Sequence, residues 1–133
     1  MSDVFLDTVG LIATWDLRDQ WHAAADAAYG ALLHQGRRLV TTPLILWECG
    51  NAAARRPYRQ RVNVIRQNLM RAGLLIEPTA REIEDAWAAF DRGEAAQAGI
   101  VDHVSFVVMR RLGITEAFTN DRHFQAAGLT TLF

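Results

Sequence analysis

Near the amino terminus, the segment Val4-Phe5-Leu6-Asp7-Thr8 contains an apolar run that ends at an acid. Three consecutive apolar residues that end abruptly at an acid predict a short strand buried on both faces, as in a parallel sheet. Asp7 then stands at the carboxyl end of this strand, which is where open α/β sheets bind their ligands. An ionised carboxylate is costly to bury there without a partner. Asp7 is therefore either a cap for the following helix or part of a site.

Strands and helices alternate along the rest of the chain. Apolar runs predict further strands at residues 38–41, 74–77 and 115–119, with residues 129–132 as a candidate edge strand. Predicted helices span residues 9–15, 19–36 (capped by Asp19), 44–55, 58–70, 79–90, 101–112 and 121–127, and residues 91–99 are left as a loop. This alternation predicts an α/β fold with three α/β/α layers and a central parallel sheet of about four to five strands. The length fits a single domain over residues 1–133.

Composition restricts the class of function. Half of the 133 residues are hydrophobic and 22% are charged, as in an ordinary globular protein. The formal net charge of -1 argues against a general polyanion binder, so contact with nucleic acid would need a local basic patch. A single cysteine, Cys49, suits a reducing compartment. With no signal-peptide pattern and no apolar run of roughly 18–20 residues, we expect a cytoplasmic protein without a membrane partner.

Three further acids occupy informative positions. Glu48 lies in an apolar helix and shares one face with Asn51 and Arg55, which is either a polar stripe at a site or a solvent face with a Glu48–Arg55 pair. Asp102 opens a helix that is apolar on most of its circumference, and Asp121 follows the strand at residues 115–119. Each of these two aspartates has an alternative role as a helix cap or as a partner of the helix dipole.

The four acids are more informative as a set than singly. Three are expected at the carboxyl edge of the sheet, and Glu48 is expected to project from a helix beside it. Two carboxylates about 4 Å apart repel by about 4 kcal/mol at an effective dielectric constant near 20, so converging acids need cations or protons. Oxygen ligands suit Mg²⁺ or Mn²⁺. The chemistry that such a site serves best is phosphodiester hydrolysis.

At these residues the chain resembles the PIN domain family, in particular its VapC-type toxin branch. The matching motifs are Val4-Phe5-Leu6-Asp7-Thr8, Thr42-Pro43 through Glu48 to Asn51, Val101-Asp102-His103-Val104-Ser105-Phe106, and Thr119-Asn120-Asp121-Arg122-His123-Phe124. The resemblance implies that Asp7, Glu48, Asp102 and Asp121 are catalytic acids that bind Mg²⁺ or Mn²⁺. It also implies supporting roles for Thr8 and Asn120, to which we add Asn51 from its helix face. Family members cleave RNA, form homodimers and are held inactive by a cognate antitoxin, so we expect the same here.

A basic cluster surrounds Pro57. Arg55, Arg56 and Arg59 could grip RNA phosphates near Glu48, receive acidic residues of an antitoxin, or form a solvated turn. His103 and His123 adjoin acids, but we interpret both as structural because a metal-bound water needs no histidine base.

Two other classes of function remain as rivals. The first is a PIN-like module that binds RNA or a protein without cutting. The second is a phosphotransfer domain of the receiver or haloacid-dehalogenase kind. That second class fits poorly, because Val9 stands where a dehalogenase needs its second aspartate and Glu77 where a receiver needs its phospho-accepting aspartate.

Overall fold

A single parallel sheet organises the computed structural model, which describes residues 2–133; Met1, the first residue of the expected domain, lies outside the described residues. The strands are β1 (Val4–Leu6), β2 (Leu39–Val40), β3 (Glu116–Phe118) and β4 (Thr130–Thr131), in the order β2-β1-β3-β4. The central strand β1 places Phe5 opposite both Val40 and Ala117. All three residues of β1 are fully buried, as a strand covered on both faces should be. The predicted parallel sheet is confirmed.

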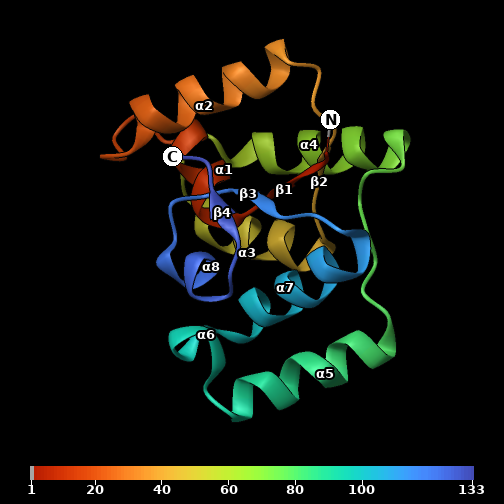
Figure 1. Ribbon diagram of the computed structural model, residues 1–133. Helices are drawn as coiled ribbons and strands as arrows, with labels where there is room; N and C mark the ends of the chain where they lie inside the picture. The colour runs from red at the N-terminus through yellow and green to blue at the C-terminus, as the bar shows by residue number, and fades with distance from the viewer. Residues whose placement is uncertain (1) are drawn as a thin grey trace.

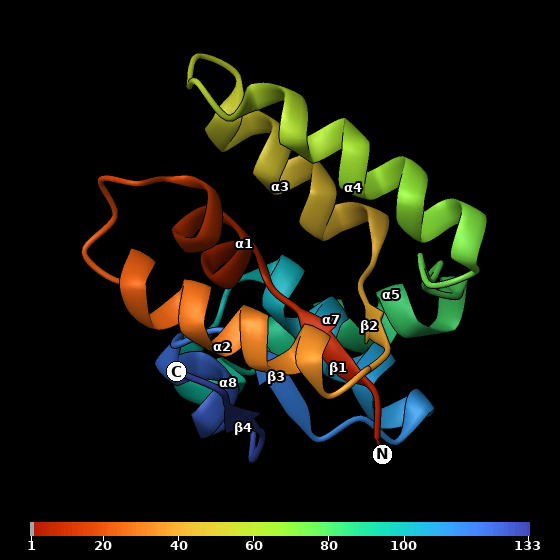
Figure 2. The ribbon, with the colours of Figure 1, turned by 90° about the horizontal axis from the view of Figure 1, so that it is seen from above.

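Helices cover both faces of this sheet. They are α1 (Thr8–Trp15), α2 (His22–His34), α3 (Pro43–Ala53), α4 (Arg59–Ala72), α5 (Ala80–Asp91), α6 (Glu94–Gln97), α7 (Ile100–Leu112) and α8 (Arg122–Ala126). In Figure 1, α2 lies on one side of the sheet, α7 and α8 lie on the other, and α5 packs outside α7. Figure 2 shows α3 and α4 as an antiparallel pair beside the sheet. The three-layer α/β/α prediction is confirmed.

Three local predictions were wrong. Residues 91–99, expected to be a loop, contain the short element α6 (Glu94–Gln97). Residues 74–77 form no strand but only an isolated bridge between Leu75 and Thr41. Two residues after Thr41 the chain enters α3 at Pro43, which has no N–H to donate. The segment that follows β2 therefore offers residues 76–77 no further strand backbone to pair with. Asp19 does not cap α2, since its side chain accepts a bond from the Trp21 N–H at 2.7 Å and so makes the turn that precedes the helix.

The outer helix α5 is attached to α7 by a capped helix start and a small apolar cluster. Thr79 and Glu82 form a reciprocal capping box at the start of α5, where the sequence predicted a helix over residues 79–90. Glu82 also accepts a bond from Arg111 of α7 at 2.8 Å. Ala86 packs with Val104 and Val108 in an apolar cluster separate from the main core. Of the helices in residues 2–133, none is long and apolar enough to cross a membrane.

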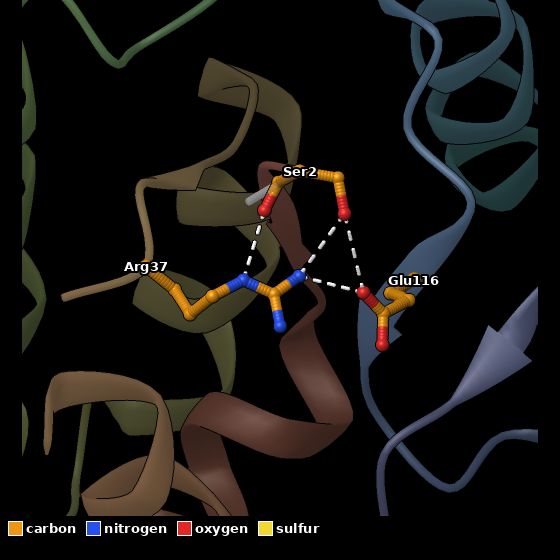
Figure 3. Close-up of polar contacts among 3 residues, drawn as sticks. All are labelled: Ser2, Arg37 and Glu116. Carbon is orange, nitrogen blue, oxygen red and sulfur yellow. Dashed lines mark hydrogen bonds and ion pairs between the residues drawn. The ribbon is translucent and has the colours of Figure 1, made fainter. Parts of the chain in front are cut away.

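An arginine with a buried side chain forms hydrogen bonds at the edge of the sheet where the strands begin, which we call the amino edge. Arg37 donates from Nη2 to Glu116 Oε1 at 2.6 Å and from Nε to the carbonyl oxygen of Ser2 at 2.9 Å (Figure 3). The arginine side chain is 8% exposed. These bonds join the segments that precede β1 and β2 to the first residue of β3. The opposite, carboxyl edge carries the predicted acids.

Candidate functional site

All four predicted acids line one cleft at the carboxyl edge of the sheet. The cleft has a volume of about 600 Å³ and is lined by Asp7, Thr8, Val9, Glu48, Asn51, Ala52, Asp102 and Asp121. The expected supporting residues Thr8 and Asn51 are therefore in the cleft, whereas Asn120 is not among its lining residues. Asp102 does not follow a strand, which agrees with its predicted place at the start of an apolar helix. It lies in the first turn of α7, and only Asp7 and Asp121 come from strand ends.

Asp7 is the most deeply buried of the acids. It is 2% exposed and stands at the N-cap position of α1, yet its side chain makes no capping bond. Its Oδ2 instead accepts a bond from Thr119 Oγ1 at 2.8 Å. Burial raises the pKa of Asp7 to about 7; the Thr119 bond opposes this, and the charges of Asp102 and Asp121 add to it. The cap interpretation of Asp7 is thus not realised.

Thr119 is a site residue that the sequence reasoning missed. It is fully buried at the end of β3. While its hydroxyl donates to Asp7, the same oxygen accepts from the Asp121 N–H at 3.1 Å, so one side chain joins two acids. The sequence does carry an indication of this role. A threonine at the end of a predicted buried strand, two positions before an acid, lies at the same sheet edge as the acid that ends the neighbouring strand. The sequence prediction names Asn120, the next residue along the chain, for this supporting role.

Glu48 is oriented by Thr8. The Thr8 hydroxyl donates to Glu48 Oε1 at 2.6 Å, which ties the start of α1 to the middle of α3. The alternative, an ion pair between Glu48 and Arg55, is not formed among residues 2–133. Glu48 is only partly buried, so its other oxygen remains available to the cleft.

Asp102 and Asp121 complete the acidic wall. The pKa of Asp102 is raised to about 6, mainly by burial and also by the charges of Asp121 and Glu48, while His123 acts in the opposite direction. Asp121 does cap α8, since its Oδ1 accepts from the His123 N–H at 2.9 Å. The cap and the site are compatible for Asp121, because it lines the cleft as well.

The two histidines next to acids differ in their surroundings. His103 is buried, makes edge-on ring contacts with Phe90 and Phe106, and is not among the cleft-lining residues. His123 lies on α8, where its Nδ1 is 3.1 Å from the carbonyl oxygen of Ala95. Neither histidine is among the residues that line the cleft.

The donor set of the cleft fits a hard divalent cation. Four carboxylates and no thiolate or imidazole line it, and such oxygen donors favour Mg²⁺ or Mn²⁺. Burial is the main cause of the raised pKa values of Asp7 and Asp102, and the charges of neighbouring carboxylates add to it, so a cation would relieve part of the cost of ionising both groups. As they stand, no three Asp, Glu, His or Cys side chains in the described part of the chain are close enough together to hold a metal ion.

Arginines stand at one end of the cleft. Arg55 and Arg56 line a neighbouring hollow that shares Asn51 and Ala52 with it. Arg59 begins α4, on the other side of the same turn. All three arginines are exposed, and none forms an ion pair with a carboxylate among residues 2–133. Their guanidinium groups are free to meet an anion that lies across the acidic cleft.

Known proteins share this fold and sequence pattern. The model of the PIN domain family matches residues 4–129. VapC20 of Mycobacterium tuberculosis, described as a sarcin–ricin loop cleaving toxin, is 25% identical, with a TM-score of 0.78 over 96% of this chain and 97% of its own. FitAcB of Neisseria gonorrhoeae (TM-score 0.64, 98% of this chain and 96% of its own) and FitAB bound to a DNA fragment (0.62, 96% and 92%) are each 16% identical and share the fold. No curated protein sequence matches the chain.

Proposed function

This chain belongs to the PIN domain family, and from that premise we propose that it is a divalent-metal-dependent endoribonuclease, the toxin of a type II toxin–antitoxin pair. The observation that carries the proposal is the meeting of four carboxylates in one cleft at the carboxyl edge of the sheet. The similarity to VapC20, a toxin that cleaves the sarcin–ricin loop, supports RNA as the substrate class.

The residues of the cleft have separate tasks in this mechanism. Asp7, Glu48, Asp102 and Asp121 would hold Mg²⁺ or Mn²⁺, with Thr8 orienting Glu48 and Thr119 orienting Asp7. When bound, the metal supplies a water of lowered pKa and offsets the charge of the scissile phosphate. The burial of Asp7 and Asp102 strengthens their attraction to a cation, because charges interact more strongly in a medium of low dielectric constant.

The exposed arginines supply the contact with the RNA backbone. Arg55 and Arg56 stand beside the cleft, where guanidinium groups can pair with phosphate oxygens on the flank of the scissile bond. Arg59, at the start of α4, extends this basic surface. The overall charge of -1 makes such a local patch necessary for binding a polyanion.

The antitoxin would occupy the grooves between α1 and α4. The first has a volume of about 390 Å³, with Trp15 and Tyr58 as apolar lining and Arg18, Arg56 and Arg61 at its sides. A second groove of about 460 Å³ continues from it past Trp15 and Arg61. Apolar walls with arginines beside them fit an apolar segment that carries acidic side chains. Arg56 lines both this groove and the hollow next to the cleft, so such a segment would compete with RNA.

A homodimer is the expected assembly. Trp47 is 66% exposed on α3, next to a hollow of about 420 Å³ that Met70 and Leu75 also line. An exposed apolar face of this kind is typical of an interface. Sedimentation of wild type and Trp47→Glu would test it, with a monomeric variant expected and an unchanged mass for both proteins counting against this face.

RNA cleavage by the purified protein tests the proposal. The substrates are an RNA that contains the sarcin–ricin loop and a set of other structured RNAs, each with Mg²⁺, with Mn²⁺ and with EDTA. Wild type and Asp26→Asn, which changes an exposed acid on α2, should cut only with metal, and Asp7→Asn should not cut. Metal-independent cutting, or cutting by Asp7→Asn, would refute the four-carboxylate mechanism. Binding of RNA without cutting would favour the non-catalytic module.

A further inference from the structure

The segment that precedes α7 has an unusual backbone. Ala95, Ala96 and Gln97 have φ angles of 53°, 56° and 61°, and they form what we call the left-handed turn (Glu94–Gln97). L-residues other than Asn and Asp pay a steric penalty in this region, so three in succession persist only where the surroundings hold them. The turn is closed by the bond from the Gln97 N–H to the Gly93 oxygen at 3.2 Å.

One side chain of α8 reaches this turn. His123 Nδ1 is 3.1 Å from the Ala95 carbonyl oxygen. Because a carbonyl oxygen can only accept, Nδ1 must carry the proton, which fixes the orientation of the ring. Among residues 2–133 this is the one hydrogen bond between α8 and the segment that joins α5 to α7. Ala95 also packs against the main core, which holds its carbonyl in place.

One end of this link lies two positions after Asp121 in the chain, and the other lies seven positions before Asp102. On one side, His123 follows Asp121 by two positions, and its backbone N–H donates to Asp121 Oδ1 at 2.9 Å. On the other side, the left-handed turn leads through Gly99 into the first turn of α7, which carries Asp102. A movement of α8 away from the turn would therefore change the distance between Asp102 and Asp121.

We propose that His123 is a positioning residue, whose Nδ1 bond to the Ala95 carbonyl ties α8 to the left-handed turn and so fixes the spacing of Asp102 and Asp121 for metal binding. It acts through the two aspartates and touches neither the metal nor RNA. The inference rests on the proposed function only in taking the cleft to be a metal site.

Three substitutions at His123 separate this role from others. The amide nitrogen of His123→Asn lies close to the position of Nδ1 and can still donate to Ala95. In His123→Gln the nitrogen lies near the position of Nε2, and His123→Ala has none. We expect the dissociation constant for Mn²⁺, measured by calorimetry without RNA, to rise by about tenfold in the Ala and Gln variants and to stay near the wild-type value in the Asn variant. With saturating Mn²⁺, KM for RNA should be unchanged in all three.

A second pair of variants tests the turn itself. The Ala96 side chain is exposed, so its replacement removes no packing. Ala96→Val disfavours a positive φ and should weaken Mn²⁺ binding, whereas Ala96→Gly accommodates it and should bind like wild type. Since both changes break one link, His123→Ala combined with Ala96→Val should be little worse than either alone. Far-UV circular dichroism of each variant checks that it folds.

The outcomes distinguish this inference from the proposed function. Wild-type cleavage of RNA together with unchanged Mn²⁺ affinity in His123→Ala would overturn the inference and leave the nuclease standing. Failure of His123→Asn to restore the affinity would also overturn it. Mn²⁺ binding with the expected order of variants, but with no RNA cut by wild type, would support the inference and refute the nuclease. Wild type that binds no Mn²⁺ would overturn both.

Discussion

At the scale of single residues, the cleft depends on hydroxyl groups as much as on acids. Asp7 is held by Thr119 and Glu48 by Thr8, each through one short bond. A bond to a charged acceptor is worth about 1.5–3 kcal/mol, enough to decide which way a carboxylate points. The acids provide the charge of the site, and the two threonines provide its orientation.

Thr119→Val should therefore impair the site while its acids remain intact. Without the hydroxyl, the contribution that lowers the pKa of Asp7 is lost, so the pKa of this carboxyl should rise further. The pH dependence of metal-supported RNA cleavage should shift to higher pH, and Mn²⁺ should bind about tenfold more weakly. Thr119→Ser keeps the hydroxyl and is the matched control. An unchanged pH profile in Thr119→Val would show that the hydroxyl does not act on Asp7.

Asp7→Asn should lose metal-dependent activity and gain stability without metal. The neutral amide avoids the cost of a buried charge beside Asp102 and Asp121, and it can still accept the Thr119 bond. Asp102→Asn should behave likewise. In EDTA at neutral pH both variants should melt at a higher temperature than wild type, and Asp26→Asn should not. Lower melting temperatures in both would mean that the acids do not repel one another.

At the scale of elements, the helix ends were the most predictable features, because they depend on local chemistry. Gly73 and Gly113 end α4 and α7 with φ angles of 71° and 68°, which glycine adopts at little cost. Thr79 begins α5 with its capping box. Residues 74–77 were mistaken for a strand, because their apolar pattern does not reveal that the neighbouring edge ends at Pro43. The left-handed turn carries no glycine or asparagine to signal it.

The close packing of α1 on β3 can be tested by comparing two glycine-to-alanine substitutions, one at this contact and one away from it. A Cβ on Gly10 would lie 2.1 Å from the carbonyl oxygen of Phe118, so Gly10→Ala must push α1 away from the sheet. We expect it to lower the free energy of unfolding by about 1–3 kcal/mol, measured by urea denaturation, and to weaken metal binding because α1 follows Asp7. Gly30 on α2 has no atoms near its Cβ position, and Gly30→Ala should stabilise the protein by up to about 1 kcal/mol. Equal effects at both glycines would contradict this contact.

At the scale of the whole molecule, the cleft draws on widely separated parts of the chain. The acids could be predicted, since an acid at the end of an apolar run is visible in the sequence. Which side chains join them could not, because the bond between Thr119 and Asp7 spans 112 positions and depends on the strand order. The contact of His123 with Ala95 escaped prediction for the same reason, since it needs a backbone carbonyl turned toward α8.

The pH dependence of stability should reveal the acidic cleft in the metal-free protein. Folding raises the pKa of Asp7 and Asp102 from their ordinary value of 3.8 to about 7 and about 6, so the folded state binds protons more tightly than the unfolded chain. Stability from these groups is greatest below pH 4 and is lost as the pH rises through 6 and 7. In EDTA, the free energy of unfolding should be lower at pH 8 than at pH 5.

Saturating Mn²⁺ should reverse this trend, because the metal binds the deprotonated acids. Asp7→Asn should show a smaller difference between the two pH values in EDTA, which makes it the control. If the metal-free wild type is as stable at pH 8 as at pH 5, the acids are not coupled to folding in this way.

The strand order has a kinetic consequence. The first strand of the chain is central, and it is not flanked on both sides until β3 joins it. The bonds that lock the amino edge likewise join Ser2 to Glu116 across 114 positions and Arg37 to Glu116 across 79. Pairings between such distant segments form slowly, because the loop between them must close first. We therefore expect Asp7 and Asp121 to come together late in folding, so that an incompletely folded chain lacks the four-carboxylate cleft.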